Sequence, residues 1–185
     1  MTTIPARVSK QQYYMNIAEE VSKRATCFSS HFGCIIVKDD QIVSTGYNGA
    51  PRKTKDCYEI GFCLRRKLGI PSGQQYEICR SVHGEQNAII NAARSGVGLL
   101  GADLYLFGRR VFEGQDALIK AYPCFICKKM ILNAGIKRVF GNDEKGGLVE
   151  YNVEDWTKEW SEHDMVDDTQ KYNAGYKMGQ QQANS

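Results

Sequence analysis

Four side chains in two short segments have the types and spacing of a metal-ligand set with an acid beside it. His83 and Glu85 stand two residues apart, and Cys124 and Cys127 stand three residues apart. One histidine and two cysteines supply three ligands for zinc, and a three-ligand site leaves the fourth position open to water. A purely structural site would carry a fourth cysteine or histidine close to one of the pairs. The sequence therefore predicts a catalytic zinc held by His83, Cys124 and Cys127.

Glu85 is the expected proton carrier of this site. Zinc lowers the pKa of a bound water towards ~7, which makes zinc-bound hydroxide the nucleophile at neutral pH. Glu85 lies next to the ligands but outside their set. Its carboxylate can therefore take a proton from the water and deliver it to the departing group, first as general base and then as general acid.

Both site segments are expected to begin helices. Apolar residues recur at helical spacing over 82–95 and over 124–134, and a glycine follows each segment. Pro123 suits a helix start, because the first turn has no use for its missing N–H. At a helix N-terminus the thiols of Cys124 and Cys127 gain acidity, and their i, i+3 spacing places both on one face.

The remaining patterns predict an α/β fold. They comprise a helix over 12–24, a hairpin of 33–37 and 42–45, strands over 103–107 and 137–140, an irregular segment 51–80 and a polar insertion or flap over 108–122. This order favours a three-layer α/β/α sandwich with a central mixed sheet. We expect one domain over 1–185, with its core at about 12–140 and a C-terminal extension over 141–185. In the extension, Val153, Trp156 and Trp160 indicate a helix that packs either on its own core or on another subunit, and 180–185 is expected to be disordered.

Composition limits the possible partners. The 185 residues are 42% hydrophobic and 24% charged, with a net charge of +3. This charge gives no reason to expect long nucleic acid as a partner, and no apolar run reaches the ~20 residues of a membrane span. Seven cysteines, two of them in a metal-type pair, indicate a reducing compartment. We therefore expect a cytoplasmic protein, in the host cytoplasm if the source is viral.

Further motifs carry a family resemblance. The order H-x-E then P-C-x-x-C is that of zinc-dependent nucleobase deaminases. From about Tyr13 to Phe140 the chain resembles the zinc-dependent cytidine/deoxycytidylate deaminase superfamily, and within it the deoxycytidylate (dCMP) deaminases. The run Gly46-Tyr47-Asn48-Gly49-Ala50-Pro51 carries most of this likeness. The other matching segments are 25–27, 33–37, 61–65, 70–73, 79–83, 85–89 and 133–137.

The resemblance implies a function in detail. It implies a hydrolase of the cytidine-deaminase-like fold that converts dCMP to dUMP and ammonia, which supplies thymidylate synthesis. It implies that Asn48 hydrogen-bonds the nucleotide near its sugar and that the backbone around Gly84 touches the pyrimidine edge. It also implies an allosteric homo-oligomer, often a hexamer, that dCTP with magnesium activates and dTTP inhibits.

Two features depart from the family pattern. The residue between the histidine and the glutamate is usually alanine, whereas here it is Gly84. Glycine costs the first helical turn ~1 kcal/mol in propensity. The insertion at 108–122 is also longer than usual, so it could cap the site, contact another subunit or alter effector binding.

The five cysteines outside the predicted catalytic site could pack in the core, bind a second metal or be free thiols. Cys34 lies in an apolar strand and is expected in the core. Cys27, Cys57, Cys63 and Cys79 could bind a second, structural zinc that orders the 51–80 segment, or they could be free thiols. Related viral enzymes carry a second metal and Cys27 matches one of its ligand positions, but the matching histidines are absent. Such a site would brace the helix of His83.

The sequence does not decide between several substrates, or between an enzyme and a binding protein. A substrate phosphate needs a cation or a helix N-terminus, and the candidate cations are Arg52, Lys53, Lys55, Arg65, Arg66 and Arg80, among which the sequence does not choose. A deaminase could instead act on cytidine, dCTP or an adenosine in tRNA. A DNA-uptake or regulatory protein could keep the zinc fold without turnover, although such a protein would have no use for Glu85.

Overall fold

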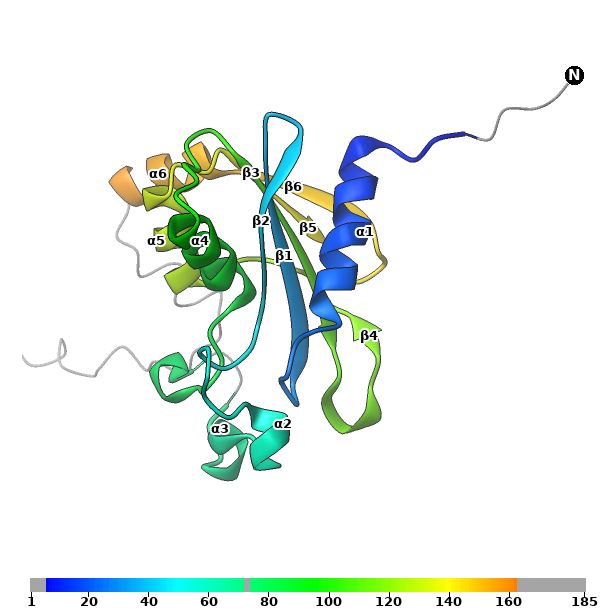
Figure 1. The fold of residues 1–185 in the computed structure, drawn as a ribbon, viewed down its shortest axis with the longest axis vertical. Coiled ribbons are helices and arrows are strands. Elements are labelled where there is room, and N and C mark those ends of the chain that lie inside the picture. The colour runs from blue at the N-terminus through cyan, green and yellow to red at the C-terminus, as the bar shows by residue number, and fades with distance from the viewer. Residues whose placement is uncertain (1–5, 72–73, 163–185) are drawn as a thin grey trace, which may run out of the picture.

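The computed structural model describes residues 6–71 and 74–162 of the chain. Its strands are β1 (Ser30–Lys38), β2 (Gln41–Tyr47), β3 (Asp103–Arg110), β4 (Ala117–Leu118), β5 (Arg138–Asn142) and β6 (Leu148–Asn152). Its helices are α1 (Lys10–Ser22), α2 (Cys57–Ile60), α3 (Leu64–Lys67), α4 (Gly84–Arg94), α5 (Phe125–Asn133) and α6 (Val153–Glu162), with short 3-10 turns η1 (Tyr76–Ile78) and η2 (Phe112–Gly114). In Figure 1 the strands form one central sheet, with α1 along one face and α4, α5 and α6 along the other. The predicted three-layer sandwich is confirmed.

The sheet is mixed, as predicted. Its strand order is β2-β1-β3-β5-β6, and β4 pairs with the end of β3. Strand β1 lies antiparallel to both β2 and β3, β5 lies antiparallel to β6, and only β3 and β5 run parallel among these neighbours. A parallel pair needs a crossover connection, and α5 lies within the connection from β3 to β5.

Side chains of the central strands alternate between the two faces of the sheet, so the buried residues form two clusters, one on each face. Ile35, Tyr105 and Phe107 point towards α1 and pack with Tyr14 and Ala18 in one cluster of buried residues. The neighbouring strand positions point the opposite way, because successive side chains of a strand alternate between faces. The second cluster contains Cys34, Ile36, Leu104, Leu106 and Val139 from the strands, together with Ala88, Ala92, Ile131 and Trp156 from α4, α5 and α6. Cys34 is fully buried, as expected for a core thiol.

The chain beyond Gly141 contains more regular structure than its sequence pattern indicates. Strand β6 adds an edge to the sheet, and α6 follows it directly. Val153 and Trp156 are each only 4% exposed and pack in the α4–α5 cluster, so this helix folds on its own core. Strand β6 was not predicted from the sequence, whereas α6 lies where Val153, Trp156 and Trp160 indicated a helix. The end expected to be disordered, 180–185, lies outside the described residues.

The segment expected to be a flap is partly an extension of the sheet. Strand β3 continues to Arg110, and Arg109 and Arg110 pair with Leu118 and Ala117 of β4. The segment 51–80 is largely irregular, as predicted, with one-turn helices α2 and α3 and the turn η1. Among the described residues, no helix combines the length and hydropathy needed to cross a bilayer.

Helix α4 lies directly against the backbone of β2 at Gly46. A methyl group built on Gly46 would lie 2.3 Å from both the amide nitrogen of Ala88 and the carbonyl oxygen of Gly84. Nearby, the hydroxyl of Ser44 donates to the carbonyl of Ala88 at 2.6 Å. Close approach at Gly46 therefore sets the position of the first turn of α4, which carries Glu85.

We predict that Gly46→Ala destabilises the fold by about 3 kcal/mol, because the added methyl must push α4 away from the sheet. Urea unfolding followed by circular dichroism measures the change. Gly98→Ala is the matched control, since a methyl group there meets nothing within 4 Å. Equal midpoints for wild type and Gly46→Ala would show that α4 tolerates displacement.

Candidate active site

The structure brings the three predicted metal ligands together. The Nδ1 atom of His83 lies 3.3 Å from the sulfur of Cys124 and 3.4 Å from the sulfur of Cys127. The ligand atoms of the three residues all lie within 4.8 Å of one another, and no other group of three potential ligands in the described chain meets this spacing. Imidazole and thiolates are the ligands that zinc prefers, so this set fits one zinc ion with an open position.

The first turns of two packed helices position the ligands. His83 is the N-cap residue of α4 and Cys124 is the N-cap residue of α5, while Cys127 lies one turn into α5. The side chain of Gln86 accepts a hydrogen bond from the backbone N–H of His83 at 3.0 Å, which fixes the entry into α4. The two helices contact one another, so their N-terminal ends meet at the same edge of the sheet.

A hydrogen bond between the two thiols shifts their pKa values in opposite directions. The hydrogen bond from Cys127, followed by the contact with His83, lowers the pKa of Cys124 well below its usual value. The same hydrogen bond and the burial of its sulfur raise the pKa of Cys127. The lowered pKa favours the thiolate form of Cys124, which is the form that binds metal.

Glu85 lies beside the ligands in a site with little access to water. It is only 4% exposed, and burial raises its pKa to about 6. The side chain of Cys127 also lies within hydrogen-bonding reach of its carboxylate. A carboxyl group with a pKa close to neutral suits both directions of proton transfer. Its position agrees with the predicted role.

A cavity opens directly in front of these residues. His83, Gly84, Glu85 and Cys124 form part of its wall. Aromatic side chains complete it, and one of them, Tyr76, packs edge-to-face against His83 with ring centroids 4.9 Å apart. Phe32 and Tyr122 also line the cavity. Apolar walls with a few converging polar groups are typical of small-molecule sites.

Asn48 and Gly84 both lie at this cavity, where the resemblance places them. Asn48 is buried, and its side chain accepts from the N–H of Phe32 at 2.7 Å and donates to the carbonyl of Ser30 at 2.9 Å. It thus holds the start of β1 in place at the cavity wall. A methyl group on Gly84 would lie 3.4 Å from the carbonyl oxygen of Phe32, so alanine would fit there in ordinary contact.

The four remaining thiols gather on one side of the cavity without reaching ligand spacing. Cys57, Cys63 and Cys79 line one small pocket, and Cys27 and Cys79 line the main cavity. All seven cysteines are free, and no three of these four sulfurs lie within 4.8 Å of one another. The structure therefore brings the four segments together but does not form the second metal site.

The structure also selects among the candidate cations. Arg65 lines the cavity, whereas Arg52, Lys53, Lys55, Arg66 and Arg80 do not. Arg110, at the basic start of the 108–122 segment, lines it too, although it was not among the predicted candidate cations. The pairing of β1 with β3 brings Arg110 to the wall opposite Ser30. No local motif marks that pairing, so the sequence carried no signal for Arg110.

Comparison with known proteins agrees with this geometry. Residues 8–141 match the family model described as the cytidine and deoxycytidylate deaminase zinc-binding region. The chain is 33% identical over 133 residues to the deoxycytidylate deaminase of Schizosaccharomyces pombe, a match that covers 72% of this chain but only 37% of that protein. It is 32% identical over 139 residues to the deoxycytidylate deaminase of Mycobacterium phage D29, covering 72% of this chain and 94% of the phage protein.

A solved structure shows the same likeness. The crystal structure of dCMP deaminase from cyanophage S-TIM5 in complex with dCMP and dUMP aligns with a TM-score of 0.52 at 27% identity. The alignment covers 72% of this chain and 80% of the cyanophage chain. The family match spans both site helices, including all three ligands and Glu85. The chain therefore belongs to the cytidine and deoxycytidylate deaminase family.

Proposed function

We propose that the protein is a zinc-dependent dCMP deaminase that releases dUMP and ammonia. The observation that carries this proposal is the buried carboxyl of Glu85 beside a three-ligand His83–Cys124–Cys127 set at the wall of a cavity. This arrangement combines an open metal position with a proton carrier. A structural metal site needs neither of them.

Each group at the site has a separate role in the proposed reaction. When bound, zinc lowers the pKa of a coordinated water and so supplies the nucleophile. Glu85 would carry two protons in turn. The first would pass from the attacking water to the pyrimidine ring nitrogen, and the second from the hydroxyl added to the ring carbon to the amine, which departs as ammonia. The aromatic wall of Phe32, Tyr76 and Tyr122 limits the access of bulk water to the base. Asn48 and the backbone at Gly84, which line the same cavity, would orient the nucleotide.

The relatives support dCMP as the substrate. The D29 phage protein is named a deoxycytidylate deaminase, and the match covers nearly all of it. The cyanophage enzyme of similar fold is described in complex with dCMP and dUMP. Arginine side chains at the cavity agree with a phosphorylated substrate rather than a free nucleoside.

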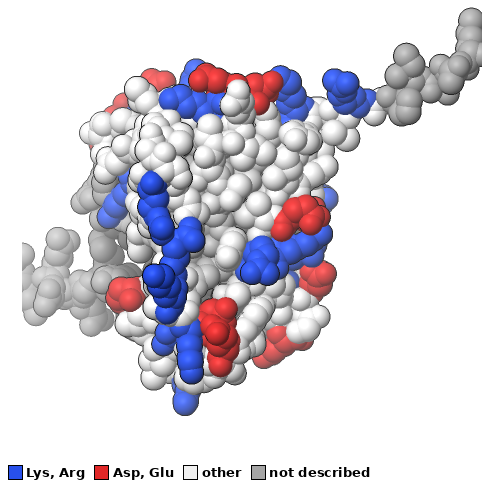
Figure 2. Space-filling model, in the orientation of Figure 1, with Lys and Arg blue, Asp and Glu red and all other residues white. Residues whose placement is uncertain are grey.

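Two alternatives have less support. An enzyme acting on tRNA would need an extended basic surface. The face in Figure 2 carries a stripe of Lys and Arg side chains and smaller basic groups on the right and along the top, with acidic side chains among them, rather than one continuous basic surface. A binding protein without turnover would not need Glu85 buried at the metal ligands, where it costs stability.

A substrate panel tests the proposal. Ammonia release by zinc-loaded protein is measured on dCMP, cytidine, deoxycytidine and dCTP, and we expect turnover with a strong preference for dCMP. Preference for an unphosphorylated nucleoside would overturn the choice of substrate. The same assay tests regulation: the family resemblance predicts activation by dCTP with magnesium and inhibition by dTTP. The resemblance also predicts a hexamer.

The free thiols support a reducing compartment such as the cytoplasm.

We also propose that Cys27, Cys57, Cys63 and Cys79 close around a structural zinc. Of the described residues in 51–81, only Cys57 is buried, so this segment lacks a core of its own. Burial, followed by the neighbouring thiols of Cys27, Cys63 and Cys79, raises the pKa of Cys57 to about 11. The backbone N–H of Ser29 donates to the sulfur of Cys27 at 3.4 Å. A metal would draw these sulfurs together and replace the missing core.

Metal counting tests this second site. We expect about two zinc ions per purified wild-type chain and about one in Cys57→Ser, with a lower melting temperature for the variant. Cys34→Ala is the control, because it also removes a buried thiol but one in the apolar core. A wild-type content of about one zinc that Cys57→Ser leaves unchanged would refute the second site.

A further inference from the structure

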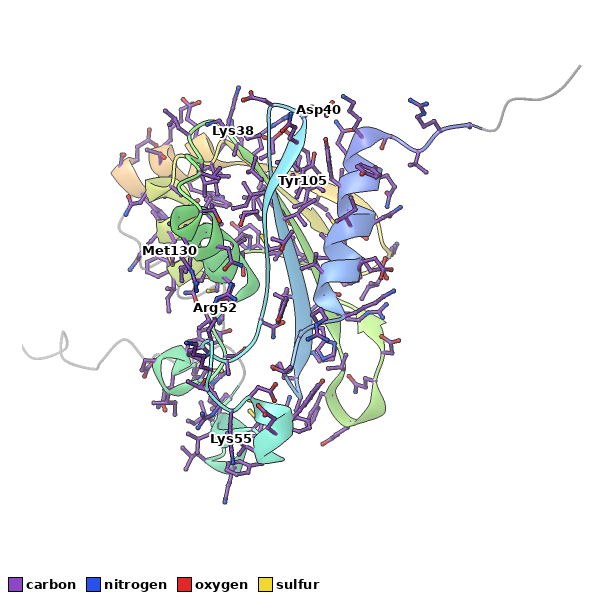
Figure 3. All side chains as sticks on the ribbon, viewed as in Figure 1. Lys38, Asp40, Arg52, Lys55, Tyr105 and Met130 are labelled. Atoms are coloured by element: carbon purple, nitrogen blue, oxygen red, sulfur yellow. The ribbon has the colours of Figure 1, made fainter. Side chains whose placement is uncertain are left out.

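A lysine is buried in the helix that carries two of the metal ligands. Lys128 follows Cys127 directly in α5 and is 0% exposed. Lysine is rarely buried in full, because its ammonium group then loses its hydration. In Figure 3, Met130 marks α5 on the side of the sheet opposite α1, and α6 packs next to this helix. A charge in this position needs an environment that stabilises it.

Three aromatic rings provide part of that environment. The Nζ atom of Lys128 lies 4.6 Å from the centre of the Tyr122 ring, 5.0 Å from that of Trp156 and 5.8 Å from that of Trp160. A cation within about 6 Å of the centre of an aromatic ring is attracted by the face of the ring, and more strongly so away from water. We call Lys128 and these three aromatic residues the lysine cage.

The lysine cage joins two separate parts of the chain. Tyr122 precedes α5, whereas Trp156 and Trp160, the two tryptophans of the chain, lie four residues apart on one face of α6. The rings of Tyr122 and Trp156 also meet edge-to-face, with their centroids 6.0 Å apart. Aromatic pairs prefer this geometry. The cage therefore fixes α6 against the segment that leads into Cys124.

Helix geometry explains how Lys128 reaches Tyr122. Lys128 lies one turn after Cys124, and its backbone N–H donates to the carbonyl of Cys124 at 2.9 Å. Residues four apart share a face of a helix, and helical side chains lean towards the N-terminal end. The long side chain of Lys128 therefore extends back along the first turn of α5 to the ring of Tyr122.

Tyr122 is the member of the cage that faces the active site. It lines the cavity together with Glu85 and Cys124, whereas the other three members of the cage do not. Its ring thus contacts both the cavity and the cage. Any displacement of this ring changes the shape of the cavity next to the metal ligands.

Two nearby lysines also approach aromatic rings, but from the exposed surface. Lys129 is exposed, and its Nζ atom lies 4.2 Å from the centre of the Phe125 ring, which is not part of the cavity wall. Lys120 is exposed too, with its Nζ atom 5.8 Å from the centre of the Tyr122 ring. An exposed cation gains less from such a contact because water solvates it. Among the described lysines, Lys128 alone combines burial with contact to a ring of the cavity wall.

We propose that Lys128 is a positioning residue for the active site, whose buried ammonium holds the ring of Tyr122 at the cavity and makes α6 part of the substrate-binding structure. The inference rests on the proposed function for the identity of the substrate. Lys128 touches no reacting atom and acts through Tyr122. An apolar side chain of the same length would fill the space, but it would not attract the faces of three rings to one point.

Binding to an inactive enzyme tests the positioning role separately from the chemistry. In a Glu85→Gln background and at equal zinc content, calorimetry measures the Kd for dCMP with and without Lys128→Met, which keeps the length of the side chain and removes its charge. We expect Lys128→Met to raise the Kd by about 5- to 30-fold. Lys128→Arg should stay within about 3-fold of the parent, because it restores a cation that stacks on aromatic rings. Lys129→Met is the matched control and should leave the Kd unchanged.

A double-mutant cycle distinguishes positioning from a general loss of stability. If Lys128 acts through Tyr122, Lys128→Met should change the Kd by less than about 2-fold once Tyr122→Leu is present. An effect of equal size in both backgrounds would overturn the inference. Trp156→Phe keeps a ring that attracts the cation less strongly, and it should raise the Kd by about 2- to 5-fold. This variant decides the question if Lys128→Met does not fold, and an unchanged Kd would then refute the role of the cage.

The outcomes also separate the lysine cage from the reaction. Equal affinity for dCMP with and without Lys128→Met would contradict the inference and leave the proposed function intact. If Lys128→Met weakens the binding of dCMP through Tyr122 but zinc-loaded wild-type protein releases no ammonia, the proposed function fails while the positioning role stands. Glu85→Gln protein that binds no dCMP would overturn both.

Discussion

Glu85→Gln should lower the rate of ammonia release from dCMP by about 1,000- to 10,000-fold, the contribution expected of a positioned general acid and base. Glutamine has nearly the same shape as glutamate, so it fills the same buried position next to Cys127. It cannot take up and return a proton. The zinc content and the melting temperature should therefore stay close to those of the wild type, which separates a loss of chemistry from a loss of structure.

Glu77→Gln is the matched control for this variant. Glu77 lies on the exposed side of η1, away from the cavity wall, so its neutralisation should leave turnover unchanged. A Glu85→Gln protein that keeps more than about a tenth of the wild-type rate would contradict the proposed proton transfer. A variant that loses zinc as well as activity would show instead that Glu85 supports the metal site.

Cys127→Ser should remove the catalytic zinc and, with it, measurable turnover. The sulfur of Cys127 is fully buried and lies 3.4 Å from Nδ1 of His83, so no solvent ligand can easily replace it. Serine is a poor ligand for zinc because its hydroxyl remains protonated at neutral pH. We expect the zinc content to fall by about one equivalent per chain, as measured by elemental analysis after gel filtration.

The control for this variant is Cys34→Ala, which removes another fully buried thiol. Cys34 lies in the apolar cluster under α4 and is not one of the metal ligands. Its loss should cost stability, by about 1 to 2 kcal/mol, but leave the zinc content intact. Full zinc occupancy and activity in Cys127→Ser would exclude this residue from the ligand set.

Local spacing explains why the metal site could be predicted from sequence. His83 and Cys124 both stand at the first position of a helix, and Cys127 follows one turn later. Helix starts and i, i+3 pairs are short-range features, so a single stretch of sequence is enough to recognise each of them. The order of helices and strands along the chain places both helices on the same face of the sheet. Their N-terminal ends can therefore meet.

Long-range pairing explains what the sequence did not reveal. Arg110 reaches the cavity because β3 pairs with β1 as far as Ser30, and no motif specifies how far that ladder extends. Arg65 could not be separated from Arg66 by sequence, since only the fold turns one guanidinium towards Tyr76 and the other towards Phe112. Strand β6 was missed because it is a half-exposed edge strand with a weak apolar pattern. In α6, two buried residues, Val153 and Trp156, hold the helix on the core.

The most direct test of the proposed function is the product balance of the zinc-loaded protein with dCMP. Chromatography follows dCMP and dUMP while a coupled assay follows ammonia, with Glu85→Gln run in parallel. The proposal predicts dUMP and ammonia in equal amounts from the wild type and almost none from the variant. Unchanged dCMP in the presence of fully zinc-loaded wild-type protein would contradict it.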